Sequence, residues 1–424
     1  MKVDYIEETS VRKALAFEIE SEIVEKEIDE RSRELARKAR IPGFRPGKIP
    51  ADVIKKRFRG QVLEDVAEAL VNRVVFQELE GRGLKPVAMP KVQDLKIEEN
   101  QPMTFRAVFE TLPLLEAPEW RGLRAGAKRS PVTEEAVEQE LEQLRENAAR
   151  FEPIEGRVSQ QGDYAVLDLI WKPQGGGKGG RDESALIEVG SQDNHPDFNA
   201  GLLGLRIDET REIRASYAAD HASPALAGRT IVYTVTLKGL KSKLLPAKDD
   251  EFAKDLDFDS LQALRDDARS KLLAAEERRL DHEMKEQLVS ALVERAGFEV
   301  PESLVERHMS ARTENAARGL ALQGIDPTKI KMDWKGYRES QREEALKAAK
   351  ADLLIDEIAR RENVEVSDAE LDLELTRLAA RVRKSKQALR AQLEKDGDLG
   401  ALRARIREGK VLDLIKANAT LEVE

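Results

Sequence analysis

The residues best suited to binding chemistry lie in one short segment, residues 41–50, which reads IPGFRPGKIP. Its two glycines tolerate positive φ angles and its three prolines restrict the chain, so we expect a tight, partly preorganised loop. The side chains that such a loop projects outward are one aromatic ring and two cations, Phe44, Arg45 and Lys48. Cations engage phosphate or carboxylate, while an exposed ring stacks on a base or fills an apolar notch. The loop is therefore a candidate contact for RNA or a protein. The alternative is that Phe44 folds back and is buried against its own helices.

Charge is distributed unevenly around this loop. The chain of 424 residues has 71 basic and 81 acidic side chains, a formal net charge of −10. Residues 31–59 hold eleven basic side chains and two acidic ones, net +9, which leaves −19 for the other residues. A basic hairpin on an acidic body favours one oriented contact with a polyanion over coating by the whole molecule. A solvated helix surface is the alternative interpretation of such a basic run.

Helices and strands are predicted to hold the loop in place. Apolar residues recur at helical spacing before the loop and after it, at Val24, Ile28 and Leu35 and at Leu63, Ala67, Leu70 and Val74. Alternating apolar residues predict strands over 11–19 and 103–109. Residues 1–112 thus form an α+β unit, and Pro113 and Pro118 mark the start of a linker.

The rest of the chain shows two further patterns. Thr133 is expected to cap a charged helix that runs to about residue 150, after which residues 163–237 alternate with period 2 and predict a small antiparallel β domain. From about residue 249 the chain is almost entirely helical, with roughly five helices expected from its Gly and Pro punctuation. Ser367 with Glu370, and Asp259 with Gln262, resemble capping boxes. The fold class is therefore α+β and multidomain.

Composition excludes several kinds of chemistry. The chain has no cysteine, so disulfides, thiol nucleophiles and Cys-ligated metals are ruled out. Its four histidines form no metal-type pair, and no phosphate loop is present, because Gly179 follows Lys178 where Ser or Thr is required. No cofactor and no metal are expected. With neither an apolar leader nor a membrane-length apolar run, we expect a cytoplasmic protein without a membrane partner.

The octapeptide GFRPGKIP, residues 43–50, resembles the ribosome-binding signature of the bacterial trigger factor family, chaperones that meet nascent chains at the tunnel exit. The resemblance implies four segments: a ribosome-binding domain (1–112), a linker with a connecting helix (113–154), an FKBP-like isomerase domain (155–242) and a helical chaperone domain (243–424). It also implies that the large ribosomal subunit, through a ribosomal protein and rRNA, is contacted by Gly43, Phe44, Arg45, Pro46, Gly47 and Lys48. Nascent and unfolded polypeptides would be the clients, and free molecules would form a weak homodimer.

FKBP-type isomerases bury proline in an aromatic pocket and stabilise a twisted amide, against a rotation barrier of about 20 kcal/mol. By resemblance, residues 189–205 place Phe198 at the floor of this pocket, and Tyr233 is the aromatic of the last strand. The other pocket candidates are Leu169, where an aromatic is usual, Tyr217, and His221 near a usual tyrosine. Phe198, Tyr217 and Tyr233 could instead be ordinary core residues.

Several positions depart from the FKBP pattern. His195 and Asp197 stand where isoleucine and glycine are usual, and Ala185 replaces another aromatic. The GGGKGG tract, residues 175–180, replaces the usual Phe and acid of the flap; we expect a mobile hairpin there, since glycine-rich chain is too flexible to pack. The resemblance with these departures implies an FKBP-shaped pocket that is depleted in rings, and it leaves appreciable and weakened isomerase activity as the two alternatives.

No motif marks a client site in the helices. Residues 345–361 place Leu346, Ala349, Leu353 and Ile358 on one side, which indicates packing between helices. Small apolar patches among charges would suit weak, reversible contacts with many unfolded chains. Three functions remain open: an ATP-independent ribosome-docked chaperone with isomerase activity, a free isomerase, and a ribosome-binding factor without clients. The loop favours the first over the second, and the long helical part favours it over the third.

Overall fold

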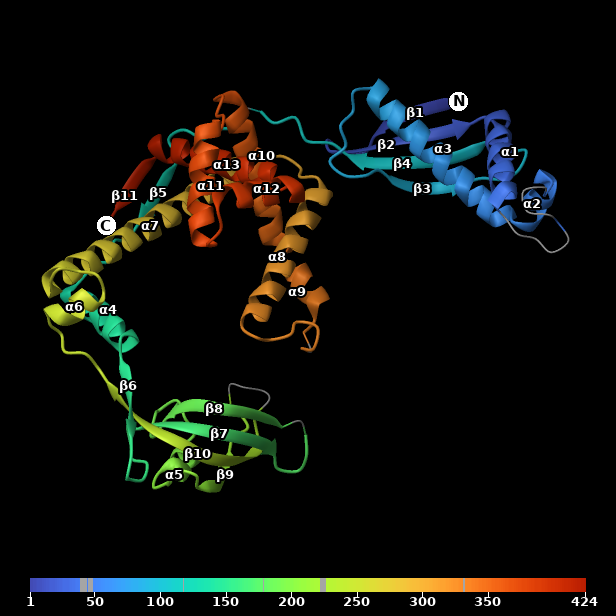
Figure 1. Cartoon of the computed structure of the whole chain (residues 1–424). Coiled ribbons are helices and arrows are strands. Elements are labelled where there is room, and N and C mark those ends of the chain that lie inside the picture. The colour runs from blue at the N-terminus through green and yellow to red at the C-terminus, as the bar shows by residue number, and fades with distance from the viewer. Residues whose placement is uncertain (39–43, 45–48, 117, 178, 222–225, 331) are drawn as a thin grey trace. The chain divides into compact units, whose positions relative to one another are not determined.

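The protein is described by a computed structural model that covers residues 1–424 apart from 39–43, 45–48, 117, 178, 222–225 and 331. The chain divides into two compact units, one of residues 1–128 with 280–424 and one of residues 129–279. Both contain helices and sheets, which confirms the α+β multidomain class (Figure 1). In the part of the chain that is described, none of the helices combines the length and apolar character that crossing a membrane requires.

The first unit begins with a four-stranded antiparallel sheet in the order β1-β2-β4-β3. Its strands are β1 (Lys2–Glu7), β2 (Arg12–Ile19), β3 (Lys91–Lys96) and β4 (Met103–Glu110). The two strands predicted from alternation are the central ones, β2 and β4. Phe17 and Phe105 lie opposite each other in the register and stack with ring centroids 4.7 Å apart. One face of the sheet is therefore a packed core.

Three helices complete this core: α1 (Ser21–Lys38), α2 (Ala51–Arg57) and α3 (Arg59–Gly81). Figure 1 shows α3 lying across the sheet, and the helical spacing predicted for Val24, Ile28, Leu70 and Val74 is confirmed, because all four are buried against the strands. Sequence periodicity fails for the outermost residues of the pattern, since Leu35 and Leu63 are only partly buried at the edge of the core.

The second half of the first unit is helical. Its helices are α8 (Glu302–Leu322), α9 (Trp334–Ser340), α10 (Arg342–Arg361), α11 (Asp368–Arg381), α12 (Lys386–Asp396) and α13 (Leu399–Ala417). The Ser367–Glu370 capping box is confirmed. Of the predicted packing positions on α10, Ala349, Leu353 and Ile358 are buried, but Leu346 is 39% exposed.

The estimate of about five helices after residue 249 is too low, since the described residues there form eight, α6 to α13. Short helices account for the difference. For example, Asp333 caps the seven-residue α9 by accepting from Gly336 N at 2.9 Å, and Gly397, at φ 79°, ends α12 in a left-handed conformation.

A second, two-stranded sheet in the first unit was not predicted. Strand β5 (Arg124–Ala127) pairs in parallel with β11 (Thr420–Val423). Four residues are too few for period-2 alternation to be recognised, and the two strands come from distant parts of the sequence. Strand pairing of this kind depends on the tertiary fold.

The second unit holds the β domain and three helical segments. Its elements are α4 (Glu134–Asn147), β6 (Arg150–Ile154), β7 (Tyr164–Pro173), β8 (Gly180–Glu188), α5 (Pro196–Leu202), β9 (Thr210–Ser216), β10 (Thr230–Leu244), α6 (Asp250–Asp255) and the first part of α7 (Leu261–Arg295). The antiparallel sheet has the order β6-β10-β7-β8, with β9 also paired to β10. The predicted small antiparallel domain is thus confirmed, with β6 as an addition.

Two local expectations in this unit need correction. The side chain that caps α7 is Ser260, which accepts from Ala263 N at 3.2 Å, because the helix begins one residue later than a cap at Asp259 requires. The glycine tract joins β7 to β8 as a hairpin, but part of it packs tightly. A Cβ atom on Gly180 would lie 2.2 Å from the Trp171 ring, so glycine is needed there for space.

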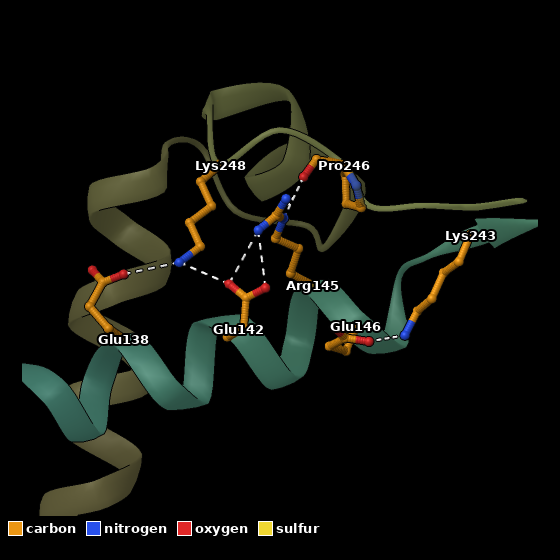
Figure 2. Close-up of polar contacts among 7 residues, drawn as sticks. All are labelled: Glu138, Glu142, Arg145, Glu146, Lys243, Pro246 and Lys248. Atoms are coloured by element: carbon orange, nitrogen blue, oxygen red, sulfur yellow. Dashed lines mark hydrogen bonds and ion pairs between the residues drawn. The ribbon is translucent and has the colours of Figure 1, made fainter. Parts of the chain in front are cut away.

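Helix α4 is fastened to the chain that leaves the β domain (Figure 2). Lys248 lies 2.9 Å from Glu142 and 3.3 Å from Glu138, and Arg145 donates to the carbonyl oxygen of Pro246 at 2.7 Å. Lys243 pairs with Glu146 one turn further along α4. Thr133 caps this helix, as predicted, by accepting from Ala136 N at 3.2 Å. The chain entering the β domain and the chain leaving it are therefore held together by charge-assisted bonds.

Candidate functional sites

The basic loop is described at one of its candidate residues. Phe44 is 40% exposed, in agreement with the outward projection that the sequence predicts and against its burial in the core. The other candidate residues, Gly43, Arg45, Pro46, Gly47 and Lys48, lie outside the described residues. The loop connects the end of α1 at Lys38 to the start of α2 at Ala51.

The chain on the C-terminal side of the loop is anchored in the core. Ile49 is 6% exposed and Ile54 is fully buried, and both pack in the cluster that contains Leu70 on α3. Pro50 stands at the N-cap of α2 with φ −62°, the value that a proline ring imposes. The exposed ring of Phe44 thus lies five residues before Ile49, whose side chain is buried in the core.

Polar contacts fix the helices beside the loop. Glu27 on α1 is 5% exposed and accepts from Arg31 at 3.2 Å and from Arg73 on α3 at 2.9 Å. Lys55 on α2 pairs with Asp29 on α1, and its hydrogen bond lowers the pKa of the Asp29 carboxyl. All three helices are therefore linked by buried or half-buried charge pairs.

The formal charge of +9 on residues 31–59 overstates the positive charge that is available to a binding partner. Arg31 and Lys55 are engaged by the acids just described, and Arg59 pairs with Glu99 at 3.2 Å. The exposed basic side chains with no ion pair to another described residue are Arg33, Arg37, Lys56 and Arg57. The available positive charge thus lies on the C-terminal half of α1, which leads into the loop, and on the last turn of α2, at the end of that helix away from the loop.

The candidate isomerase residues come together from separate elements of the second unit. Phe198 on α5 is 7% exposed and meets Tyr233 on β10 edge to face, with centroids 5.0 Å apart. Tyr217, one residue beyond β9, shares a hydrogen bond of 2.7 Å with the Tyr233 hydroxyl. His221 meets the Tyr217 ring edge to face at 5.0 Å, and Leu169 on β7 packs in the same cluster as Phe198 and Tyr233. All five candidates thus belong to one cluster of contacting side chains.

His195 also belongs to this cluster, although it was singled out above only as a departure from the FKBP pattern. Its ring centroid lies 4.7 Å from that of Tyr217. Its Nδ1 accepts from Asp197 N at 3.2 Å, and its Nε2 lies 3.1 Å from the carbonyl oxygen of Ser216, which can only accept. The two ring nitrogens of His195 are thus both engaged by main-chain groups. A histidine just before Pro196, the first residue of α5, was the available signal, because it marks an N-cap.

The cluster offers apolar surface and hydroxyls. Burial raises the pKa of Tyr233, and the hydrogen bond with Tyr217 raises it further, so Tyr233 stays protonated at neutral pH. An aromatic cluster with the protonated Tyr233 hydroxyl can exclude water from an X-Pro amide and donate to its carbonyl oxygen. Leu169 and Ala185, where the FKBP resemblance leads to the expectation of rings, are half-buried and carry none.

Metal-ligating groups and exposed apolar side chains also bear on function. Within the described residues, no group of three or more His, Cys, Asp or Glu side chains is placed to hold a metal ion. The described residues from 302 onward carry scattered exposed apolar side chains on and between the helices, with exposed fractions from 40% to 85% at Leu322, Ile325, Leu373 and Val382. Such isolated patches suit weak contacts with unfolded chains.

Comparisons with known proteins point to one family. The family model described as bacterial trigger factor protein matches residues 1–144, and that of the bacterial trigger factor C-terminus matches residues 260–417. The trigger factor of Solibacter usitatus is 33% identical over 412 residues, 97% of this chain and 98% of that protein. The trigger factor of Anaeromyxobacter dehalogenans is 34% identical over 431 residues, 100% of both. A solved structure described as "Promiscuous Substrate Recognition in Folding and Assembly Activities of the Trigger Factor Chaperone" has 23% identity and a TM-score of 0.48, covering 98% of this chain and 99% of that one.

Proposed function

Because the chain belongs to the trigger factor family of ribosome-associated chaperones, we propose that it holds nascent and unfolded polypeptides, without ATP, while docked beside the tunnel exit of the large ribosomal subunit. In this proposal residues 1–112 bind the ribosome, residues 113–154 connect, residues 155–242 isomerise X-Pro bonds and residues 243–424 hold clients. The protein works in the cytoplasm, partly on ribosomes and partly free as a weak dimer.

The observation that carries the ribosome contact is an exposed ring, Phe44, in a loop whose flanking helices carry exposed cations. Phe44 is 40% exposed, whereas Ile49 and Ile54 beyond it are buried. An exposed aromatic side chain that fills a pocket on a partner is typical of a binding hot spot. The exposed cations on α1 and on the last turn of α2 add attraction to rRNA phosphates, while the ring suits a notch on a ribosomal protein.

Co-sedimentation with ribosomes tests this contact. The variant Phe44→Ala/Arg45→Ala/Lys48→Ala should lose binding while its circular dichroism spectrum stays unchanged. The matched control is Phe76→Ala/Lys85→Ala/Lys91→Ala, which removes one exposed ring and two exposed cations from other surfaces of residues 1–112. Undiminished binding of the first variant, or equal loss in the control, would remove the loop from the proposal.

Salt dependence separates the two kinds of partner. If the cations meet phosphates, the affinity should fall with salt by a log-log slope of about 0.9 per phosphate neutralised. A salt-insensitive affinity would assign the contact to Phe44 and a ribosomal protein. Suppression of aggregation of an unfolded protein tests client holding, and its absence would reduce the protein to a ribosome-binding factor.

The isomerase proposal depends on the aromatic cluster of the second unit. It is supported by the successive contacts of Phe198 with Tyr233, of Tyr233 with Tyr217 and of Tyr217 with His221. These side chains resemble the base of an FKBP pocket that has few aromatic residues at its sides. We expect weak acceleration of a proline-limited refolding reaction. His221→Ala, at an exposed position, should lower the rate further, whereas Phe151→Ala, which removes a 38% exposed ring elsewhere in the unit, should not. If the unaltered protein gives no acceleration, the domain serves only as a client-binding scaffold.

A further inference from the structure

In the small sheet of β5 and β11, alternate residues of β11 direct their main-chain groups toward β5 and toward the outer edge of the sheet. Thr420 N donates to Leu123 O at 2.8 Å, and Glu424 N donates to Ala127 O at 3.2 Å. In a strand, successive residues direct their N–H and C=O groups to opposite sides, so Thr420, Glu422 and Glu424 face β5. The amides and carbonyls of Leu421 and Val423 therefore point away from β5, along the outer edge of β11.

The two outer edges of this sheet differ in whether their main-chain groups have hydrogen-bond partners. On the outer edge of β5, the Gln287 side chain accepts from Gly126 N at 2.9 Å and donates to Gly126 O at 2.8 Å. A side-chain amide thus takes the place of a neighbouring strand. On the outer edge of β11, no hydrogen bond joins the amide of Leu421 or Val423 to another described residue. An open edge of this kind is a template for strand addition.

The apolar layer of the sheet also continues past β11. Ala125 and Ala127 are 5% and 6% exposed, because they pack on a core built by α7, α10 and α13. Their register partners Leu421 and Val423 have side chains on the same face, yet they are 37% and 49% exposed. Leu421 and Val423 therefore form the exposed edge of this apolar face. A further strand paired with β11 would cover their side chains.

We propose that the outer edge of β11 binds an extended segment of a client polypeptide as a third strand. This inference rests on the proposed chaperone function. Main-chain groups occur in every unfolded chain, so pairing with Leu421 and Val423 needs no particular sequence, and alternate apolar residues of the client cover the exposed layer. The site would thus add backbone recognition to the scattered apolar contacts of the helices.

Charge favours a client over a second copy of this chain. Glu422 and Glu424 lie on the face of the strand opposite to Leu421, at alternate positions. Two copies of β11 paired edge to edge would bring four carboxylates onto one face, and like charges at neighbouring positions destabilise a strand pair. A client segment with neutral or basic residues at the alternate positions avoids this repulsion.

The test uses the full-length protein, a short synthetic peptide of alternating valine and lysine, and the same peptide N-methylated on alternate amides. Hydrogen exchange should show the amides of Leu421 and Val423 protected by the first peptide and unprotected by the second. Among main-chain groups, Leu421→Pro/Val423→Pro removes only outward N–H groups, at positions where edge strands accept proline. We expect it to weaken peptide binding by at least about tenfold. Leu421→Thr/Val423→Thr, which keeps both amides, should retain protection by the peptide.

The outcomes separate this site from chaperone function as a whole. If a carboxymethylated, permanently unfolded protein binds while exchange at Leu421 and Val423 is unchanged, strand addition is wrong and client holding stands. If neither it nor the peptide binds, both proposals fail. Protection that rises with protein concentration in the absence of peptide would show pairing with a second copy and overturn the client as occupant.

Discussion

The loop around Phe44 and the aromatic cluster around Phe198 are built in opposite ways. The loop candidates are consecutive in the sequence, and the one described is exposed to solvent, while the fold supports it through Ile49 and Ile54. The cluster candidates come from α5, β7, β10 and the chain after β9, and the residue at their centre is 7% exposed. In the loop, the candidate binding residue and the residues that stabilise the fold are thus different; in the cluster, the candidate site residues are also core residues.

The largest expected effect tests this dual role. Phe198→Ala should lower the local free energy of unfolding of the β domain by about 3–5 kcal/mol, because it removes a buried ring and leaves a cavity. Hydrogen exchange of β7 and β10 in the full-length protein measures this loss. Any isomerase activity should fall with it, and an unchanged exchange rate would show that Phe198 is not part of the core.

A smaller loss is expected where the loop is supported. Ile54→Ala should destabilise α1, α2 and α3 by about 2–5 kcal/mol, since Ile54 is fully buried, and Ile54→Val should cost about 0.5–1.5 kcal/mol. Ribosome affinity should fall with local stability in this pair. If Ile54→Ala keeps full ribosome binding despite its instability, the loop does not depend on its anchor.

The third effect depends on pH. Tyr233 has a raised pKa in the folded protein, so its contribution to stability is complete below pH 10, the usual tyrosine pKa, and is lost as the pH rises towards the folded value. Tyr233→Phe should cost about 1 kcal/mol at neutral pH, from the lost hydrogen bond, and should flatten the decline above pH 10. Tyr217→Phe removes the same bond but keeps the decline, because Tyr233 still ionises. Exchange rates of β10 at pH 7 and above pH 10 provide the measurement.

The sequence predicted best where a structure is local. Central strands and the caps at Thr133 and Ser367 followed from alternation and capping residues, whereas turn chemistry left both exposure and burial of Phe44 open. The β5–β11 sheet, the packing of Gly180 on Trp171 and the place of His195 beside Tyr217 could not be predicted, because each depends on residues brought together by the tertiary fold. The resemblance to FKBP supplied the pocket candidates, yet it treated His195 only as a departure.

The ribosome affinity of Phe44→Ala beside that of Phe76→Ala tests the central claim most directly. Both remove an exposed phenylalanine from residues 1–112, 40% exposed in the loop and 49% exposed on α3, so both should leave stability within about 0.5 kcal/mol of the unaltered protein. We predict that Phe44→Ala binds ribosomes at least about tenfold more weakly, while Phe76→Ala binds as the unaltered protein does. Equal affinity of the two variants would contradict the assignment of the loop as the ribosome contact.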